Sequence, residues 1–117
     1  MILVLALLLV KHYLADFPLQ NYPYLWQHKS EYGHPGGLLH SAIQAVLTIP
    51  FCIILGAWWL VPLEFLVHYH VDFLKMYFNK KYSLTQVNPA YWNLLGADQL
   101  VHGLFYIFMI ICWFKPL

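Results

Sequence analysis

Three aspartates and three histidines of this sequence form pairs four residues apart, inside otherwise apolar segments. The pairs are His12/Asp16, His68/Asp72 and Asp98/His102. Residues four apart share one face of an α-helix, so each pair presents an imidazole beside a carboxylate. A fourth histidine, His40, lies at the start of another apolar segment. Ionisable groups are costly inside a membrane and usually functional there, so these seven residues are the candidate site.

The seven residues have the ligand chemistry of a metal centre. Imidazole nitrogens and carboxylate oxygens bind zinc, manganese and iron in proteins, and helix bundles hold dinuclear centres between such side chains. The sequence therefore predicts one or two divalent ions, zinc before manganese or iron, with these ligands: His12, Asp16, His40, His68, Asp72, Asp98 and His102. The charges of two divalent cations would balance three aspartates and one bridging hydroxide. A single ion, with aspartates hydrogen-bonded to the ligating histidines, fits equally.

The composition requires an environment other than water for most of the surface. Of the 117 residues, 62% are hydrophobic and only 9% are charged, whereas a soluble domain carries about 25% charged residues. We therefore expect an integral membrane protein in contact with the lipid bilayer, and one domain is the natural count at this length. The net charge of +1 and the lack of arginine argue against nucleic-acid binding.

Four apolar segments indicate an all-α fold, an integral membrane four-helix bundle formed by a single domain over residues 1–117. The predicted spans are 2–17, 37–59, 61–78 and 91–114. Four spans place the two longer connections on one side of the membrane, together with Lys29, Lys80 and Lys81. The positive-inside rule then predicts cytoplasmic loops and both termini outside. In this topology all seven candidate residues fall at one depth, near the cytoplasmic interface.

Other ionisable residues in the spans receive less specific interpretations. His70 lies two residues from His68, so it should point elsewhere on the helix. Glu64 lies near the opposite end of its span and is expected to be interfacial or paired. Lys75 and Lys11 could each bind a substrate anion or extend to the interface. Two histidines are expected to be solvated in a loop: His28 and His34.

The motifs KHYLADFPLQ, GLLHSAIQAVL, VHYHVDFLK and ADQLVH resemble an uncharacterised family of bacterial and phage membrane proteins, domain of unknown function 3307. The family pattern corresponds to these residues: His12, Asp16, Phe17, Gln20, His40, His68, Asp72, Lys75, Asp98, Gln99 and His102. The resemblance implies a small multi-pass protein of the bacterial inner membrane, in some cases phage-borne, and it supplies no activity. The motifs are also similar, more weakly, to membrane-bound metal-dependent hydrolases. Lys11 and His70 depart from the commonest pattern of the family.

The leading functional prediction is an intramembrane metal-dependent hydrolase that acts on a lipid phosphate or other phosphoester at the cytoplasmic interface. Asp16, Asp72 or Asp98 would serve as general base where it is not a ligand, and Lys75 would offset phosphate charge. The alternative is a non-catalytic protein whose metal or hydrogen-bonded His/Asp cluster is structural while its loops contact a phage or host partner. Ion or proton transport is a third alternative. The expected partners are the bilayer, a lipid or phosphate substrate, and a second copy or a host membrane protein.

Overall fold

The computed structural model describes residues 1–114, and within this range every regular element is a helix. The four long helices are α1 (Ile2–Asp16), α3 (Pro35–Leu55), α4 (Leu60–Lys81) and α5 (Pro89–Phe114). Two short helices, η1 (Leu19–Asn21) and α2 (Pro23–Trp26), lie between α1 and α3. The predicted all-helical class is thus confirmed, with a long helix at each of the four predicted segments.

Local sequence signals explain where the long helices begin and end. α1 ends at Asp16, two residues before Pro18, which has no backbone N–H to continue the helical hydrogen bonds. His34 caps the start of α3, since its Nδ1 accepts a hydrogen bond from the Gly36 N–H at 3.0 Å. α3 ends where Gly56 adopts a left-handed conformation with φ of 76°. The helix is therefore shorter than the predicted segment 37–59, whose last residues form the turn to α4.

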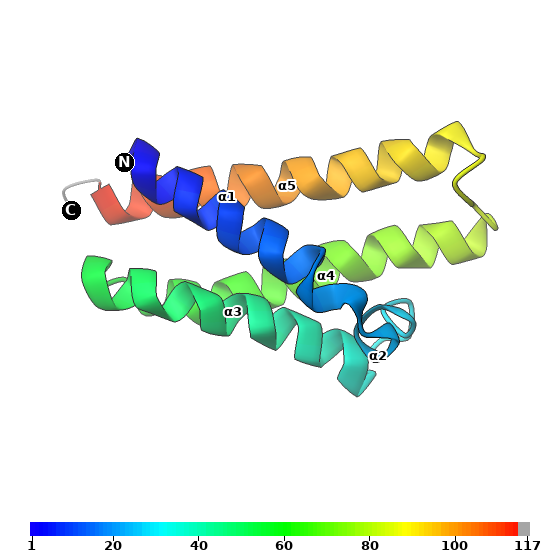
Figure 1. The fold of residues 1–117 in the computed structure, drawn as a ribbon, viewed down its shortest axis with the longest axis horizontal. Coiled ribbons are helices and arrows are strands. Elements are labelled where there is room, and N and C mark those ends of the chain that lie inside the picture. Colours follow the sequence, from blue (N-terminus) through cyan, green and yellow to red (C-terminus); the bar gives the residue numbers. More distant parts are fainter. Residues whose placement is uncertain (115–117) are drawn as a thin grey trace.

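The long helices run up and down beside one another (Figure 1). The start of α1, the end of α5 and the tight turn between α3 and α4 lie together at one end, which we call the hairpin end. The two longer connections, residues 17–34 and 82–88, lie at the other end, which we call the loop end. This arrangement puts both longer connections on the same side of the bundle.

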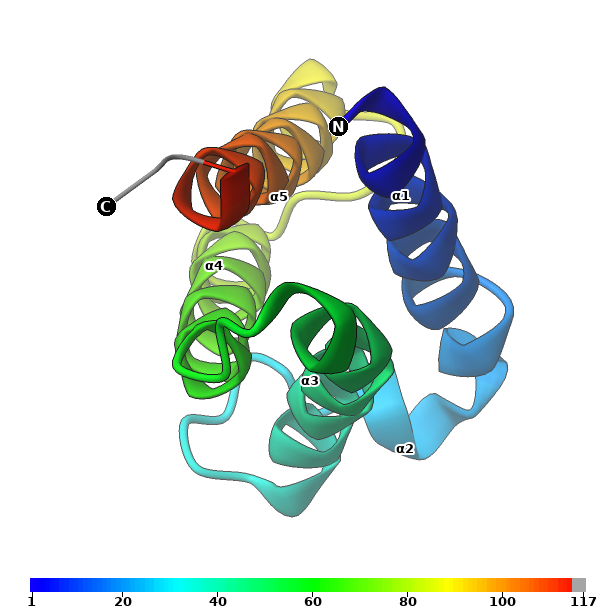
Figure 2. The same cartoon turned by 90° about the vertical axis from the view of Figure 1, so that its left-hand side faces the viewer.

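Seen from the hairpin end, the four long helices form a ring in which α1 lies opposite α4 (Figure 2). α1 packs on α3 and α5, and α4 packs on the same two helices. An apolar cluster fills the ring towards the hairpin end: Leu8, Leu60, Tyr106, Met109 and Ile110. Most of the other buried side chains are polar, so the interior of the bundle combines an apolar plug with a polar centre.

The outer surface of the bundle is largely apolar, with many exposed leucine, isoleucine, valine and aromatic side chains. Three segments are long and apolar enough to cross a membrane: Ile2–Asn21, Pro35–Leu55 and Pro89–Phe114. These features indicate a membrane protein. α4 has a similar length but carries more charge, from Glu64, Asp72 and Lys75 in its body and two lysines in its last turn.

Candidate metal centre

Each long helix carries its interior polar side chains at intervals of four residues, on the face that points into the ring. The four sets are His12 and Asp16 on α1, His40, Gln44 and Thr48 on α3, Glu64, His68 and Asp72 on α4, and Asp98, His102 and Tyr106 on α5. All of these side chains are buried. The structure therefore brings the seven predicted site residues together inside the bundle.

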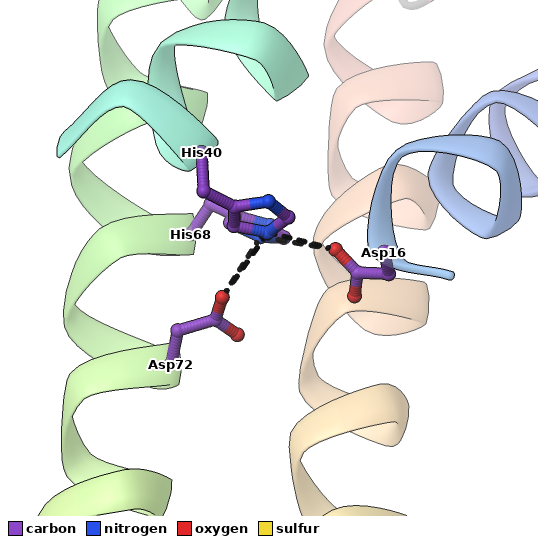
Figure 3. A group of neighbouring side chains, drawn as sticks. All are labelled: Asp16, His40, His68 and Asp72. Atoms are coloured by element: carbon purple, nitrogen blue, oxygen red, sulfur yellow. Dashed lines mark hydrogen bonds and ion pairs between the residues drawn. The ribbon is translucent and has the colours of Figure 1, made fainter. Parts of the chain in front are cut away.

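Four of the seven converge on one point from three helices (Figure 3). The Nε2 atoms of His40 and His68 lie 2.9 Å apart. Asp16 Oδ1 lies 3.0 Å from the His40 nitrogen and 3.3 Å from the His68 nitrogen. Asp72 Oδ2 lies 3.3 Å from His40 Nε2 and 3.2 Å from His68 Nε2. We call these residues the four-ligand group.

Hydrogen bonds alone do not account for the four-ligand group. Ionised carboxylates only accept, and each Nε2 carries at most one proton, so at most two N–H groups serve five contacts of 3.3 Å or less. A tetrahedral zinc ion with bonds of about 2.0–2.1 Å holds its ligand atoms about 3.3 Å apart. The spacing and chemistry of the four atoms therefore suit a divalent cation.

A second group of potential ligands shares Asp16 with the first. It combines Asp16, Asp98 and His102, all buried. His102 Nε2 lies 3.1 Å from Asp98 Oδ1 and 3.4 Å from Asp72 Oδ1. Asp16 therefore belongs to both groups, and Asp72 contacts His102 of the second group through its other carboxylate oxygen.

Tyr106 and Gln44 contact His12 beside the second group. The Tyr106 hydroxyl donates to Glu64 Oε1 at 3.1 Å, and His12 Nδ1 lies 3.0 Å from the same hydroxyl and 3.3 Å from the Gln44 amide nitrogen. His12 Nε2 lies 3.0 Å from both Asp16 Oδ2 and Gln99 Oε1. His12 therefore faces Asp16 with one ring nitrogen, and Tyr106 and Gln44 with the other.

Two lysines neutralise part of the charge of the aspartates. Lys29 Nζ lies 2.5 Å from Asp72 Oδ2, and the Lys29 side chain is only 4% exposed. Lys75 Nζ donates to Asp98 Oδ2 at 2.9 Å. With neutral histidines, three carboxylates and two ammonium groups leave the centre with one net negative charge. Asp16 is the aspartate without a lysine partner among the described residues.

A buried network supports the centre from the hairpin side. Lys11 pairs with Glu64 and also donates to Gln44 Oε1 at 2.8 Å and to Tyr106 OH at 3.1 Å. The Gln44 amide in turn donates to Asp16 Oδ1 at 2.8 Å. Of the two expectations for Glu64, interfacial or paired, the structure shows the second. Lys11 points into the bundle and does not extend to the interface.

A cavity of about 780 Å³ leads from the loop end to the centre. Asp16 reaches its wall, and so do Lys29, Lys75 and Lys80, together with polar residues of both longer connections. Asp16 is the one acidic residue in this lining. An anion that enters from the loop end therefore meets three lysines and the edge of the four-ligand group. We call this space the loop-end cavity.

Three histidines lie outside the buried centre, and two of them, His28 and His34, are half-buried and form a group of potential ligands with the exposed Glu31. His70 is exposed, and its Nε2 lies 2.9 Å from the hydroxyl of Tyr32 in the loop. His28 and His34 stack at the loop end with ring centroids 4.0 Å apart, and His28 lies 3.2 Å from Glu31. None of these three residues belongs to the buried groups.

Comparison with known proteins identifies a family. The profile of a family described as "Protein of unknown function (DUF3307)" matches residues 4–116. The chain belongs to the DUF3307 family. The match includes all the His/Asp motifs, so the family predicted from them is confirmed. No curated protein and no solved structure matches the chain significantly, and the similarity to membrane-bound hydrolases stays a prediction.

Four interior residues of this DUF3307 chain were not predicted as part of the site: Lys29, Thr48, Glu64 and Tyr106. Thr48 and Tyr106 lie two turns after His40 and one turn after His102, so the four-residue spacing carried a signal for both. Lys29 carried no comparable signal. It lies in a loop, and its burial depends on how that loop docks on α3 and α4.

Proposed function

We propose that this chain is a four-span bundle of the bacterial inner membrane that binds a divalent metal and hydrolyses a lipid phosphate or another phosphoester at the cytoplasmic interface. The convergence of His40, His68, Asp16 and Asp72 on one point carries the proposal. The four helices, the centre and the loop-end cavity each support a part of it.

The metal would bind first in the four-ligand group. Two imidazole nitrogens and two carboxylate oxygens favour zinc, and manganese or iron accept the same donors. A second ion would be held by Asp16, Asp98 and His102, with His12 next to Asp16. With neutral histidines, one divalent ion would leave the centre with a net charge of +1, and two ions would leave it with +3. Anionic substrate is thus favoured by charge in either case.

The chemistry would be phosphoester hydrolysis at the end of the loop-end cavity. When bound, a divalent ion would polarise the phosphoryl oxygen of the substrate and lower the pKa of a water molecule. Of the four-ligand group, Asp16 is the member that lines the cavity, so a substrate would approach the centre past Asp16. Lys29 and Lys75 line the cavity and would offset the charge of the phosphate. Asp98 lies outside the four-ligand group, so it would serve as general base where it does not bind a second ion.

All four long helices would span the membrane. α4 packs between α3 and α5 in the ring, and its charged residues Glu64, Asp72 and Lys75 are paired inside the bundle rather than exposed to lipid. Buried, paired charges are the ones a membrane span tolerates. The lysines of the loop end would place that end in the cytoplasm, with both termini outside.

The test of the activity is turnover by the purified protein loaded with zinc or manganese. We expect release of inorganic phosphate or an alcohol from lipid phosphate in mixed micelles, and a loss of at least about 100-fold in kcat for Asp98→Asn, the range expected when a general base is removed. His70→Ala, which alters an exposed histidine on the same helix as His68, should keep wild-type turnover. A metal-loaded wild type without turnover on lipid, nucleotide and aryl phosphoesters would contradict the hydrolase.

A structural role for the centre is the second candidate. Lys29 and Lys75 already pair with two of the three aspartates, which favours a cluster that holds the helices together. A loop surface rich in tyrosine and tryptophan would then contact a phage or host membrane protein. Variants that lose the metal yet keep the full biological activity of the protein would favour this candidate over hydrolysis.

A further inference from the structure

An apolar groove runs along the lipid-facing surface between α4 and α5, next to the metal centre. Its volume is about 210 Å³. Six apolar side chains line it: Val71, Leu74, Phe78, Leu94, Ala97 and Val101. Lys75 and Asp98 complete the lining. We call this space the α4–α5 groove.

The groove lies where a lipid chain would reach it. Leu74 is 49% exposed and Val101 is 41% exposed, so both walls open onto the outer surface of the bundle. Phe78 and Leu94 lie nearer the loop end, and Val71 and Val101 lie nearer the hairpin end. The groove therefore runs along the helix axes, which is the direction of a hydrocarbon chain that extends from the interface into the bilayer.

Lys75 connects the groove with the loop-end cavity, because it lines both. Its side chain is 14% exposed, and among the described residues its ammonium group donates one hydrogen bond, to Asp98. An ammonium group has three donors, so two remain for a ligand. The polar loop-end cavity and the apolar α4–α5 groove thus meet at Lys75, whose ammonium group has donors left for a ligand.

We propose that the α4–α5 groove binds the hydrocarbon chain of an anionic amphiphile whose phosphate head group lies in the loop-end cavity. The amphiphile enters sideways from the bilayer between α4 and α5. The head group contacts Lys75 and Lys29, and the chain packs on Leu74, Ala97 and Val101. This proposal rests on the proposed function, since it specifies the substrate as a membrane-resident phosphate rather than a soluble one.

The first test is photo-cross-linking of the metal-loaded protein in lipid nanodiscs. The probe is a non-hydrolysable alkyl phosphonate with a diazirine halfway along its chain, and the matched probe is the alkyl alcohol without phosphonate. We expect phosphonate cross-links concentrated on residues 71–78 and 94–101, and few from the alcohol. Equal labelling by both probes, or labels spread evenly over the outer faces of α1 and α3, would overturn the proposal.

A matched pair of variants on α5 tests the groove itself. Val101→Trp fills the groove, whereas Leu104→Trp adds the same bulk at an exposed position that does not line it. We expect Val101→Trp to lower the phosphonate cross-links and kcat/KM for a long-chain phosphate about tenfold, equivalent to the lost burial of roughly two methylene groups. Leu104→Trp should change neither, and turnover of a short, soluble aryl phosphate should be unchanged in both variants.

The two readouts separate this inference from the proposed function. Cross-links in the groove without turnover would support the groove as a lipid-binding site and contradict the proposed hydrolase activity. Turnover that depends neither on the length of the hydrocarbon chain nor on Val101→Trp would support the hydrolase activity and contradict the groove as the binding site of the hydrocarbon chain.

Discussion

Lys11 is a buried cation whose partners come from the three other long helices. It contacts Gln44 on α3, Glu64 on α4 and Tyr106 on α5, and its side chain is 7% exposed. Because a buried charge is costly without its counter-ion, this network ties the four helices together at one level. Through Gln44 and Tyr106 it also orients Asp16 and His12 in the candidate centre.

Removal of Glu64 should therefore destabilise the bundle strongly. Glu64→Gln leaves the Lys11 ammonium without its counter-ion, and we expect a loss of about 3–5 kcal/mol in the free energy of unfolding. The double variant Lys11→Met/Glu64→Gln should recover part of this loss. Lys81→Met, which removes an exposed lysine of the same helix as Glu64, should cost less than about 1 kcal/mol. Denaturant unfolding in detergent measures all three.

A double variant no more stable than Glu64→Gln alone would contradict the claim that the unpaired Lys11 ammonium group causes the loss of stability. In that case the cost would come from the lost contacts of Glu64 with Thr48 and Tyr106, and not from an unpaired ammonium group.

The four-residue spacing of histidines and aspartates predicted which residues form the centre, whereas composition predicted only a membrane protein. The i,i+4 pairs placed His12 with Asp16, and Asp98 with His102, on common helix faces, and the structure has both pairs in contact. Lys29 could not be predicted in the same way, because its contact with Asp72 spans 43 residues and depends on a loop. Pairs within a helix follow from helix geometry, whereas a contact between a loop and a helix needs the tertiary fold.

The connection from α1 to α3 is a docked element, not a free loop. The Gly33 N–H donates to Tyr69 OH on α4 at 2.6 Å, and Tyr32 contacts His70 on the same helix. Gly36 lies so close to the Tyr24 carbonyl oxygen of α2 that a Cβ atom would clash with this backbone atom. These contacts hold the segment that carries Lys29 against the centre.

Gly36→Ala should loosen this docking. The added methyl group forces α2 away from the start of α3, and we expect a loss of about 1–3 kcal/mol in stability, the usual range for overpacking. Gly96→Ala is the matched control, because a Cβ at Gly96 meets nothing within 4 Å. It should be neutral or stabilise α5 by up to about 1 kcal/mol through helix propensity. Thermal unfolding compares the two, and equal melting temperatures would contradict the close packing at Gly36.

Apolar composition located the long helices, but the short helices and the packing partners needed the structure. A helix that faces lipid outside and apolar side chains inside shows little contrast in hydrophobicity between its faces. In the sequence, the inner face of each long helix is therefore identified by its polar residues at four-residue intervals. η1 and α2 (Pro23–Trp26) are too short to give a periodic pattern, so the sequence predicted only a polar connection there.

The bundle as a whole has one polar, lysine-bearing end and one apolar end. The loop-end cavity opens at the first, and the cluster around Leu8, Leu60 and Met109 closes the interior at the second. Within residues 1–114, this apolar cluster lies between the polar centre and the hairpin end, an arrangement less suited to ion or proton transport than a continuous polar path. The orientation of the two ends in the membrane then decides which compartment the loop-end cavity faces.

Cysteine labelling tests that orientation. In a background where Cys52 and Cys112 are replaced by alanine, Gln86→Cys places a thiol at the loop end and Trp58→Cys places one at the hairpin end. Because the lysines of the loop end should stay in the cytoplasm, we expect an impermeant maleimide to label Gln86→Cys only in inverted vesicles. Trp58→Cys should be labelled only in intact spheroplasts. The reverse pattern would place the loop end outside.

The metal content of the purified protein tests the account most directly. Wild type, His40→Ala and His70→Ala are purified without chelator, loaded with zinc, and measured by elemental analysis against protein concentration. We predict at least about one ion per chain in wild type and in His70→Ala, and none in His40→Ala, because the four-ligand group then loses one of its two imidazoles. Wild-type protein that retains no stoichiometric zinc, manganese or iron would contradict the metal centre.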